Sequence, residues 1–273
     1  MPLLAVHMSV VQEVVDRLGV PELSQNVGAA LLGCTAPDRR VVTRQPRQET
    51  HYFDLENDGI GDGLKGLMRS HPEVAADPTS LGWPTRALMI GYVSHLAADE
   101  AWIVDVYRPY FANDDYLGTD PARNILDRAL QYDLEREILE DEDRLIPWRF
   151  ELSSGPPDGV PDEFIPYNVL VEWHDFVMNR VLVRDGGWAE FPRFIARFRD
   201  DPGLDEDDVA LGIPNKEAAH VHGDTVLLVR LLDVLPQGLR DDPEHRAPIE
   251  TEDPIAEDLD LVSAGAHLPQ YRP

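Results

Sequence analysis

The chain has 273 residues, enough for one large domain whose core needs neither a disulfide nor a structural metal to fold. Its 24 Lys and Arg stand against 51 Asp and Glu, and the resulting net charge of −27 disfavours nucleic acids and anionic membrane surfaces as partners. A hydrophobic content of 43% is too high for an intrinsically disordered acidic chain.

The first third of the chain predicts short helices separated by loops. Apolar residues recur at helical spacing over Val6–Leu18, and Gly19 with Pro21 ends that run. Ser24 is a plausible N-cap for a short helix that reaches Leu32. Residues 37–63 are polar and predict a loop, and a short helix is expected over residues 64–69.

The clearest predicted element is a helix from Pro84 to about Tyr110, because proline is well tolerated in a first helical turn. Apolar and polar residues of this segment share one stripe at spacings of three and four, which predicts that the stripe faces the protein interior. The residues on this stripe are Leu88, Gly91, Tyr92, His95, Asp99, Trp102 and Val106.

The second half of the chain predicts further helices. Pro121 opens one that continues to Leu139, and Pro166 opens another that ends near Val183 after a proline-rich loop over 151–166. Helices are also expected over 189–199 and 216–235. The five tryptophans are expected in the core, although aromatic faces can also bind a cationic head group; they are Trp83, Trp102, Trp148, Trp173 and Trp188.

Strand-like alternation is scarce, so the sequence predicts an all-α, single-domain helical bundle with long Pro-rich loops over residues 1–240. Residues 241–273 are acidic and read as an extended tail. Cys34 is the only cysteine, which excludes an intramolecular disulfide. The N-terminal segment lacks a basic start and no stretch is apolar enough to span a membrane, so the cytoplasm is the expected location.

The segment His95-Leu-Ala-Ala-Asp99 is the first feature with chemical content. Residues four apart on a helix lie on the same face, so the imidazole and the carboxylate could share a metal ion or form a local hydrogen bond. The pair shares its stripe with apolar residues, which favours an inward orientation. A buried carboxylate needs a partner or a metal, because an unpaired buried charge is very costly.

Two loop segments add potential ligands. Asp38 follows a proline just after a helix end, and His51 precedes an aromatic pair. Together with His95 and Asp99 they provide two imidazoles and two carboxylates, a nitrogen and oxygen set suited to zinc with room for a water. His7 on the first helix adds a third imidazole.

These segments together resemble the zinc-dependent phospholipase C family, which is related to the fungal single-strand nucleases. The resemblance covers about residues 1–110 and rests on His7 followed by LLGCTAPD, RQETHYFD and GYVSHLAADEAW. It implies an all-α bundle with a zinc cluster at one end. Carried over to this chain, it implies a zinc site formed by Asp38, His51, His95 and Asp99, with Asp99 bridging to a second zinc that His7 helps to hold.

The resemblance also implies a reaction. Asp38 would act as general base on a zinc-bound water, which becomes acidic enough to give a hydroxide nucleophile at neutral pH. The expected activity is therefore metal-dependent hydrolysis of phosphate esters. The strongly negative charge favours a small or zwitterionic ester over nucleic acid.

The chain departs from the family pattern in two places. Secreted members use the amine of a processed N-terminal Trp as a ligand, whereas this chain opens with Met1 and Pro2. No histidine lies between His95 and His174, so the third zinc site is missing or rebuilt, and one or two ions are expected. Residues that could rebuild it are His174 and the pair of His220 and Asp224.

Two other functions remain open. The dipeptide His174-Asp175 is typical of HD-type phosphohydrolases, which are also all-α, although that family needs an earlier histidine some tens of residues upstream. Alternatively, the chain is a non-catalytic metal-binding protein that acts through its acidic surface. The missing third zinc site favours this second alternative.

Overall fold

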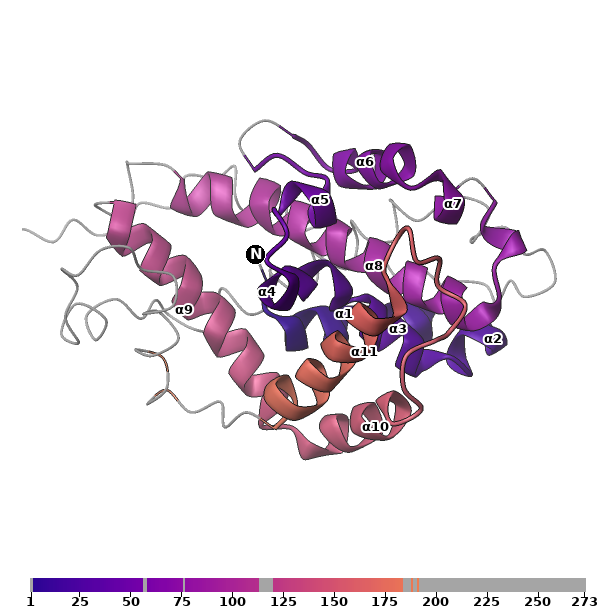
Figure 1. Cartoon of the computed structure of the whole chain (residues 1–273). Helices are drawn as coiled ribbons and strands as arrows, with labels where there is room; N and C mark the ends of the chain where they lie inside the picture. Colours follow the sequence, from indigo (N-terminus) through magenta and orange to yellow (C-terminus); the bar gives the residue numbers. More distant parts are fainter. Residues whose placement is uncertain are drawn as a thin grey trace, which may run out of the picture. The chain divides into compact units, whose positions relative to one another are not determined.

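The computed structural model describes residues 2–55, 58–75, 77–112, 120–183, 188 and 191. Every regular element in this part of the chain is a helix, which confirms the all-helical bundle (Figure 1). None of these helices is long and apolar enough to cross a membrane. Apart from Phe191, the helices predicted over 189–199 and 216–235 lie outside the described residues. The acidic tail predicted over 241–273 lies outside them as well.

Helix α8 (Trp83–Ala101) is the central element and confirms the strongest helix prediction (Figure 1). It begins after Gly82 with Pro84 in its first turn, as expected. Most of its side chains are buried, which is typical of a helix that is surrounded by others. The chain stays helical to Phe111, close to the predicted end near Tyr110, but beyond Ala101 it continues as a π-helix over Trp102–Phe111 that contains Pro109.

Helices α1 (Leu4–Leu18) and α3 (Val27–Gly33) pack against α8. Gly19 adopts a left-handed conformation with φ of 60° and caps α1, as predicted. Gly33 and Gly91 allow α3 and α8 to approach with their backbones in contact. A Cβ atom added to Gly91 would overlap the carbonyl of Ala30, and one added to Gly33 would overlap the carbonyl of Leu88.

Two predictions for the segment after α1 are wrong. Ser24 ends the short helix α2 (Pro21–Ser24) rather than capping the next one, because its hydroxyl donates to the carbonyl of Val20. Residues 37–63 are not a continuous loop. They contain most of a 3₁₀ turn (Ala36–Arg39) and all of α4 (Arg40–Thr43) and α5 (Gln48–His51). The polar composition of this segment hides three single turns that are too short to show a hydrophobic period.

The remaining helices surround this core. Helix α6 (Asp62–Ser70) confirms the short helix predicted over 64–69, and α7 (Pro72–Ala75) follows it. Helix α9 (Asp120–Leu139) begins one residue before the predicted start at Pro121, ends at Leu139 as predicted, and packs on α1 and the π-helix. Helix α10 (Glu142–Leu152) is an additional helix with a proline inside it, capped by the side chain of Asp141.

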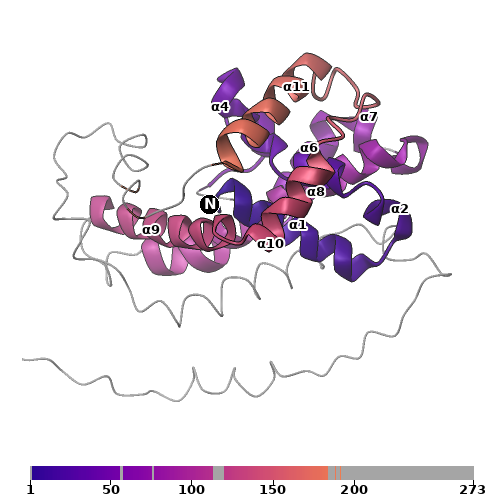
Figure 2. The ribbon, with the colours of Figure 1, turned by 90° about the horizontal axis from the view of Figure 1, so that it is seen from below.

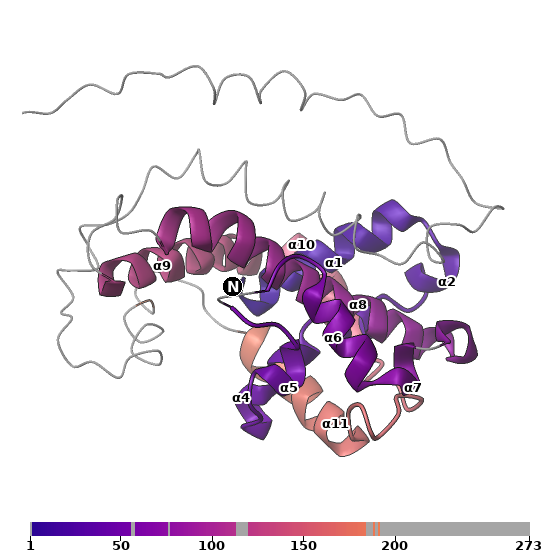
Figure 3. The same cartoon turned by 90° about the horizontal axis from the view of Figure 1, so that it is seen from above.

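Helix α11 (Tyr167–Phe176) continues as a π-helix over Val177–Val181, close to the predicted helix that opens at Pro166. Helix α4 packs against α11, and α10 packs against α3 and α9 (Figures 2 and 3). Trp102, Trp148 and Trp173 are fully buried, which confirms the core prediction for these three tryptophans.

Candidate metal centre

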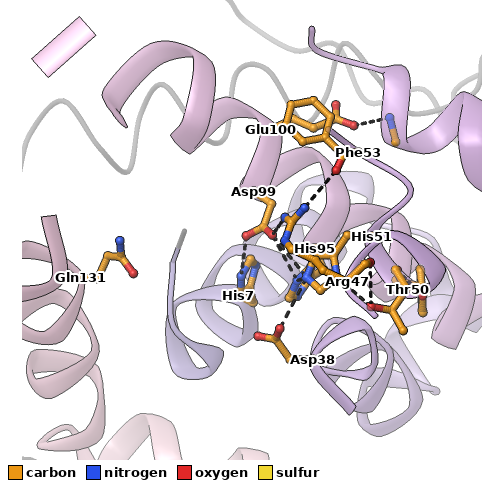
Figure 4. Close-up of polar contacts among 12 residues, drawn as sticks. His7, Asp38, Arg47, Thr50, His51, Phe53, His95, Asp99, Glu100 and Gln131 are labelled. Carbon is orange, nitrogen blue, oxygen red and sulfur yellow. Dashed lines mark hydrogen bonds and ion pairs between the residues drawn. The ribbon is translucent and has the colours of Figure 1, made fainter. Parts of the chain in front are cut away.

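Five side chains from four elements converge beside α8 (Figure 4). His7, His51, His95 and Asp99 are buried, with exposed fractions of 1%, 1%, 0% and 2%. The Asp38 side chain is 25% exposed. These residues come from α1, the 3₁₀ turn, α5 and α8, and we call the five together the candidate centre. Of the five side chains, Asp38 is therefore the one that is substantially exposed to solvent.

Hydrogen bonds fix the tautomers of two imidazoles. His95 Nδ1 lies 2.7 Å from the carbonyl oxygen of Cys34, and because a carbonyl only accepts, Nδ1 carries the proton. His51 Nδ1 lies 2.8 Å from the hydroxyl of Thr50, which donates its own proton to the carbonyl of Arg47. In the neutral rings both Nε2 atoms therefore carry a lone pair. Burial, together with nearby His7, lowers the pKa of His95 to about 3 and keeps that ring neutral.

The two Nε2 atoms face each other at 3.3 Å. Asp38 Oδ1 lies 3.4 Å from His51 Nε2, and Asp99 Oδ2 lies 3.5 Å from His51 Nε2 and 3.7 Å from His95 Nε2. Four donors around a tetrahedral zinc are separated by about 3.3–3.6 Å, given zinc–ligand bonds of about 2.0–2.2 Å. Asp38, His51 and His95 form one group whose potential ligand atoms lie close enough together to hold an ion, and Asp99 Oδ2 lies beside both of its imidazoles.

A second cluster shares residues with the first. The His7 ring stacks on His95 with centroids 3.8 Å apart, and His7 Nε2 lies 3.4 Å from Asp99 Oδ1. Both ring nitrogens of His7 and the Oδ1 atom of Asp99 are buried without a hydrogen-bond partner. Buried polar atoms nearly always have a hydrogen-bond partner. A bound metal ion could supply the missing partner for His7 and for Asp99 Oδ1. His7, His95 and Asp99 thus form a second triad that could hold an ion.

The two carboxylates of the centre are held in the ionised form. Burial alone raises the pKa of Asp99, but the neighbouring His95, His7 and His51 outweigh burial and leave it well below its usual range. Burial likewise raises the pKa of Asp38, but its interactions with the nearby His51 and His95 outweigh burial and bring this pKa below the usual range. Both side chains are therefore deprotonated at neutral pH, as a metal ligand must be.

Arg47 contacts the candidate centre through Asp99, although the sequence prediction gave it no function. Its Nη2 atom lies 3.0 Å from Asp99 Oδ2, and its Nη1 atom donates to the carbonyl of Phe53. Arg47 precedes α5 and stands one helical turn before His51. A spacing of four residues places two side chains on the same side of a helical turn, so the sequence offered only a weak indication that Arg47 lies near the site of His51.

Glu100 was also missed, although it adjoins Asp99. It is 1% exposed, and its two oxygens accept the N–H groups of Gly61 and Gly63 at 2.5 and 2.6 Å. Burial raises the pKa of Glu100 to about 7 in spite of these two hydrogen bonds. This side chain attaches the start of α6 to α8 behind the centre.

Among the other predicted ligands, His174 does not join this cluster. His174 Nε2 lies 2.8 Å from the carbonyl of Leu152, and the neighbouring Asp175 side chain is 69% exposed. Neither residue belongs to a group of potential metal ligands in the described part of the chain. His220 and Asp224 lie outside the described residues.

No protein-family model, curated protein or solved structure matches the chain. The resemblance to the zinc-dependent phospholipase C family therefore stays a prediction. The structure places His7, Asp38, His51, His95 and Asp99 together, and it contains two His/Asp clusters that could hold a metal. The identity of the metal and the assignment of these five residues as its ligands also stay predictions.

Proposed function

We propose that this protein is a zinc-dependent hydrolase of small phosphate esters, similar to the phospholipases C. The observation that carries this proposal is the pair of bare Nε2 atoms of His51 and His95, which face each other at 3.3 Å between two carboxylates. Two lone pairs at this distance repel each other unless a cation lies between them. Hydrolysis is the reaction that the sequence resemblance implies for such a centre.

The chain's own residues would hold the ion and keep the site ready. Asp38, His51, His95 and Asp99 supply four donors, while Thr50 and the backbone of Cys34 orient the two imidazoles. A bound zinc supplies a Lewis acid for the phosphoryl group and lowers the pKa of a coordinated water.

Asp38 is the residue that a substrate and a water would meet first. Its side chain is 25% exposed, whereas the other four side chains of the centre are buried. Oδ1 faces His51, and the carboxylate is deprotonated at neutral pH. Asp38 is therefore placed to accept a proton from the attacking water as general base.

The substrate we propose is small. The net charge of −27 creates a field that repels polyanions, so nucleic acid fits poorly. A single phosphate ester, zwitterionic or singly charged, is attracted locally by the ion and by Arg47 in spite of that field.

The direct test combines metal analysis with turnover. We expect about one or more equivalents of zinc in protein purified without chelator, and hydrolysis of a chromogenic phosphodiester or phosphomonoester. The Asp99→Asn variant should lose both the metal and the activity while keeping its helical circular dichroism. A His174→Gln variant is the matched control and should keep both. Wild-type protein with well under half an equivalent of metal would contradict the proposal.

One observation favours a second function. Four of the five side chains are almost fully buried, as in structural zinc sites that are closed to substrate. A non-catalytic metal-binding protein would bind stoichiometric zinc but would hydrolyse none of the phosphate esters, either as wild-type protein or as a variant that lacks the Asp38 carboxylate. The 25% exposure of Asp38 is the feature that favours the enzyme over this alternative.

A further inference from the structure

The two candidate metal positions are not equivalent, because they compete for His95. Its Nδ1 atom is bonded to the carbonyl of Cys34, so only Nε2 can bind an ion. That atom faces His51 Nε2, and Asp38 Oδ1 and Asp99 Oδ2 both lie beside His51 Nε2. Among the described residues, the second position is then left with His7 and the Oδ1 atom of Asp99. Two protein donors make a weaker site than two imidazoles together with a carboxylate.

Arg47 is a fixed positive charge at the same carboxylate. Its side chain is 11% exposed, and its Nη2 atom lies 3.0 Å from Asp99 Oδ2. A carboxylate oxygen has two lone pairs, so it can accept this N–H and still bind a metal. The first ion is therefore not blocked. A second ion at His7 and Asp99 Oδ1 must share the negative charge of Asp99 with both the first ion and the guanidinium.

We propose that Arg47 is a built-in cation that competes with the second metal ion for the charge of Asp99. The centre then holds one ion tightly and a second ion only weakly. This inference rests on the metal centre of the proposed function but concerns how that centre is filled. Its consequence is that Arg47 supplies part of the positive charge that a second ion would otherwise bring to a phosphate ester.

The test is a metal titration of the full chain, stripped with chelator and followed by calorimetry with zinc. For wild-type protein we expect one tight step and a second step at least about tenfold weaker. In Arg47→Gln the second step should tighten by about tenfold, because a unit charge about 6 Å from a divalent ion opposes its binding by about that factor even in bulk water. Arg47→Lys keeps the charge and should keep the wild-type pattern.

His7→Gln identifies the second step, because this variant should lose it and keep the first. Arg47→Met retains the aliphatic stem and replaces Arg47→Gln if the latter loses its helical circular dichroism. A second step that is unchanged or weaker in the neutral variants would overturn the inference and leave Arg47 as a residue that orients Asp99. Two equally tight steps in wild-type protein would also overturn it. A wild-type chain that binds no zinc would refute the metal centre itself and thus the proposed function as well.

Discussion

At the scale of the residue, hydrogen bonds at Nδ1 set the orientation and the tautomer of the His95 and His51 imidazoles. His95 donates to the carbonyl of Cys34, and His51 donates to the hydroxyl of Thr50. These bonds turn both Nε2 atoms toward the same point, beside Asp99. Metal-binding histidines are commonly oriented by a hydrogen bond on the second ring nitrogen, which fixes the tautomer and raises metal affinity.

Thr50→Val tests this orientation, since valine has the shape of threonine but cannot accept the Nδ1 proton of His51. We expect the affinity for zinc to fall about 10- to 100-fold, the range typical of lost outer-sphere partners. The measurement is competition with a zinc chelator of known affinity. Thr43→Val is the matched control, because the Thr43 hydroxyl contacts Gln45 and no residue of the centre. Equal affinities in both variants would show that the Thr50 bond does not orient His51.

At the scale of the element, the centre depends on how closely α3 approaches α8. Gly91 lies against the backbone of Ala30 and Cys34, and Cys34 in turn holds His95. The sequence analysis placed Gly91 on the inward stripe, but it could not show which backbone would contact it. A close backbone approach is a property of two segments far apart in sequence, so local pattern does not reveal it.

Gly91→Ala tests this packing. The added Cβ would overlap the Ala30 carbonyl, and a backbone neighbour cannot move aside as a flexible side chain can. We expect the free energy of unfolding to fall by about 1–3 kcal/mol or more, together with weaker zinc binding. Urea denaturation measures the first effect. Gly82→Ala is the control, since only the Pro84 side chain lies within 4 Å of the added Cβ, and its stability should change by less than about 0.5 kcal/mol. Comparable losses in both variants would rule out this packing effect.

Glu100→Gln tests the attachment of α6 to α8. The carboxylate accepts two N–H groups, from Gly61 and Gly63, whereas an amide offers one oxygen. One buried N–H then loses its acceptor, which costs about 1–3 kcal/mol. Hydrogen exchange should accelerate at Gly61 and Gly63. Glu13→Gln removes an exposed ion pair with Arg17 and should cost less than about 1 kcal/mol. Unchanged exchange at both glycines would count against Glu100 as an anchor.

At the scale of the whole molecule, the sequence predicted the helical class and the five residues that converge. His95 and Asp99 could be paired from their spacing, because a helix fixes the geometry between positions four apart. Asp38 and His51 were grouped with them through the family resemblance and donor chemistry, in a segment wrongly predicted as loop. The roles of Arg47 and Glu100 were not predicted, because both residues find their partners through tertiary contacts between segments far apart in sequence. Arg and Glu are also common surface residues, so their presence in the sequence indicated no particular role.

Metal removal tests how far the centre stabilises the molecule. Bound metal would join α1, the 3₁₀ turn, α5 and α8, and it would give a partner to the buried polar atoms of His7 and Asp99 that lack one. A ligand that binds only the folded state adds about 4 kcal/mol of stability at a thousandfold excess over its Kd, or about 10 °C in Tm for a domain of this size. We therefore expect zinc to raise the Tm of chelator-treated protein by about that amount.

Magnesium should raise the Tm much less, because it prefers octahedral oxygen ligands to imidazole. Asp99→Asn should remove most of the zinc effect, since Asp99 contributes an oxygen to both clusters. Its metal-free form should be less stable than metal-free wild-type protein, because the substitution breaks the buried ion pair between Asp99 and Arg47. If zinc left the Tm of wild-type protein unchanged, the buried imidazoles and carboxylates would have to be stable without an ion, which would contradict the metal centre at the scale of the whole fold.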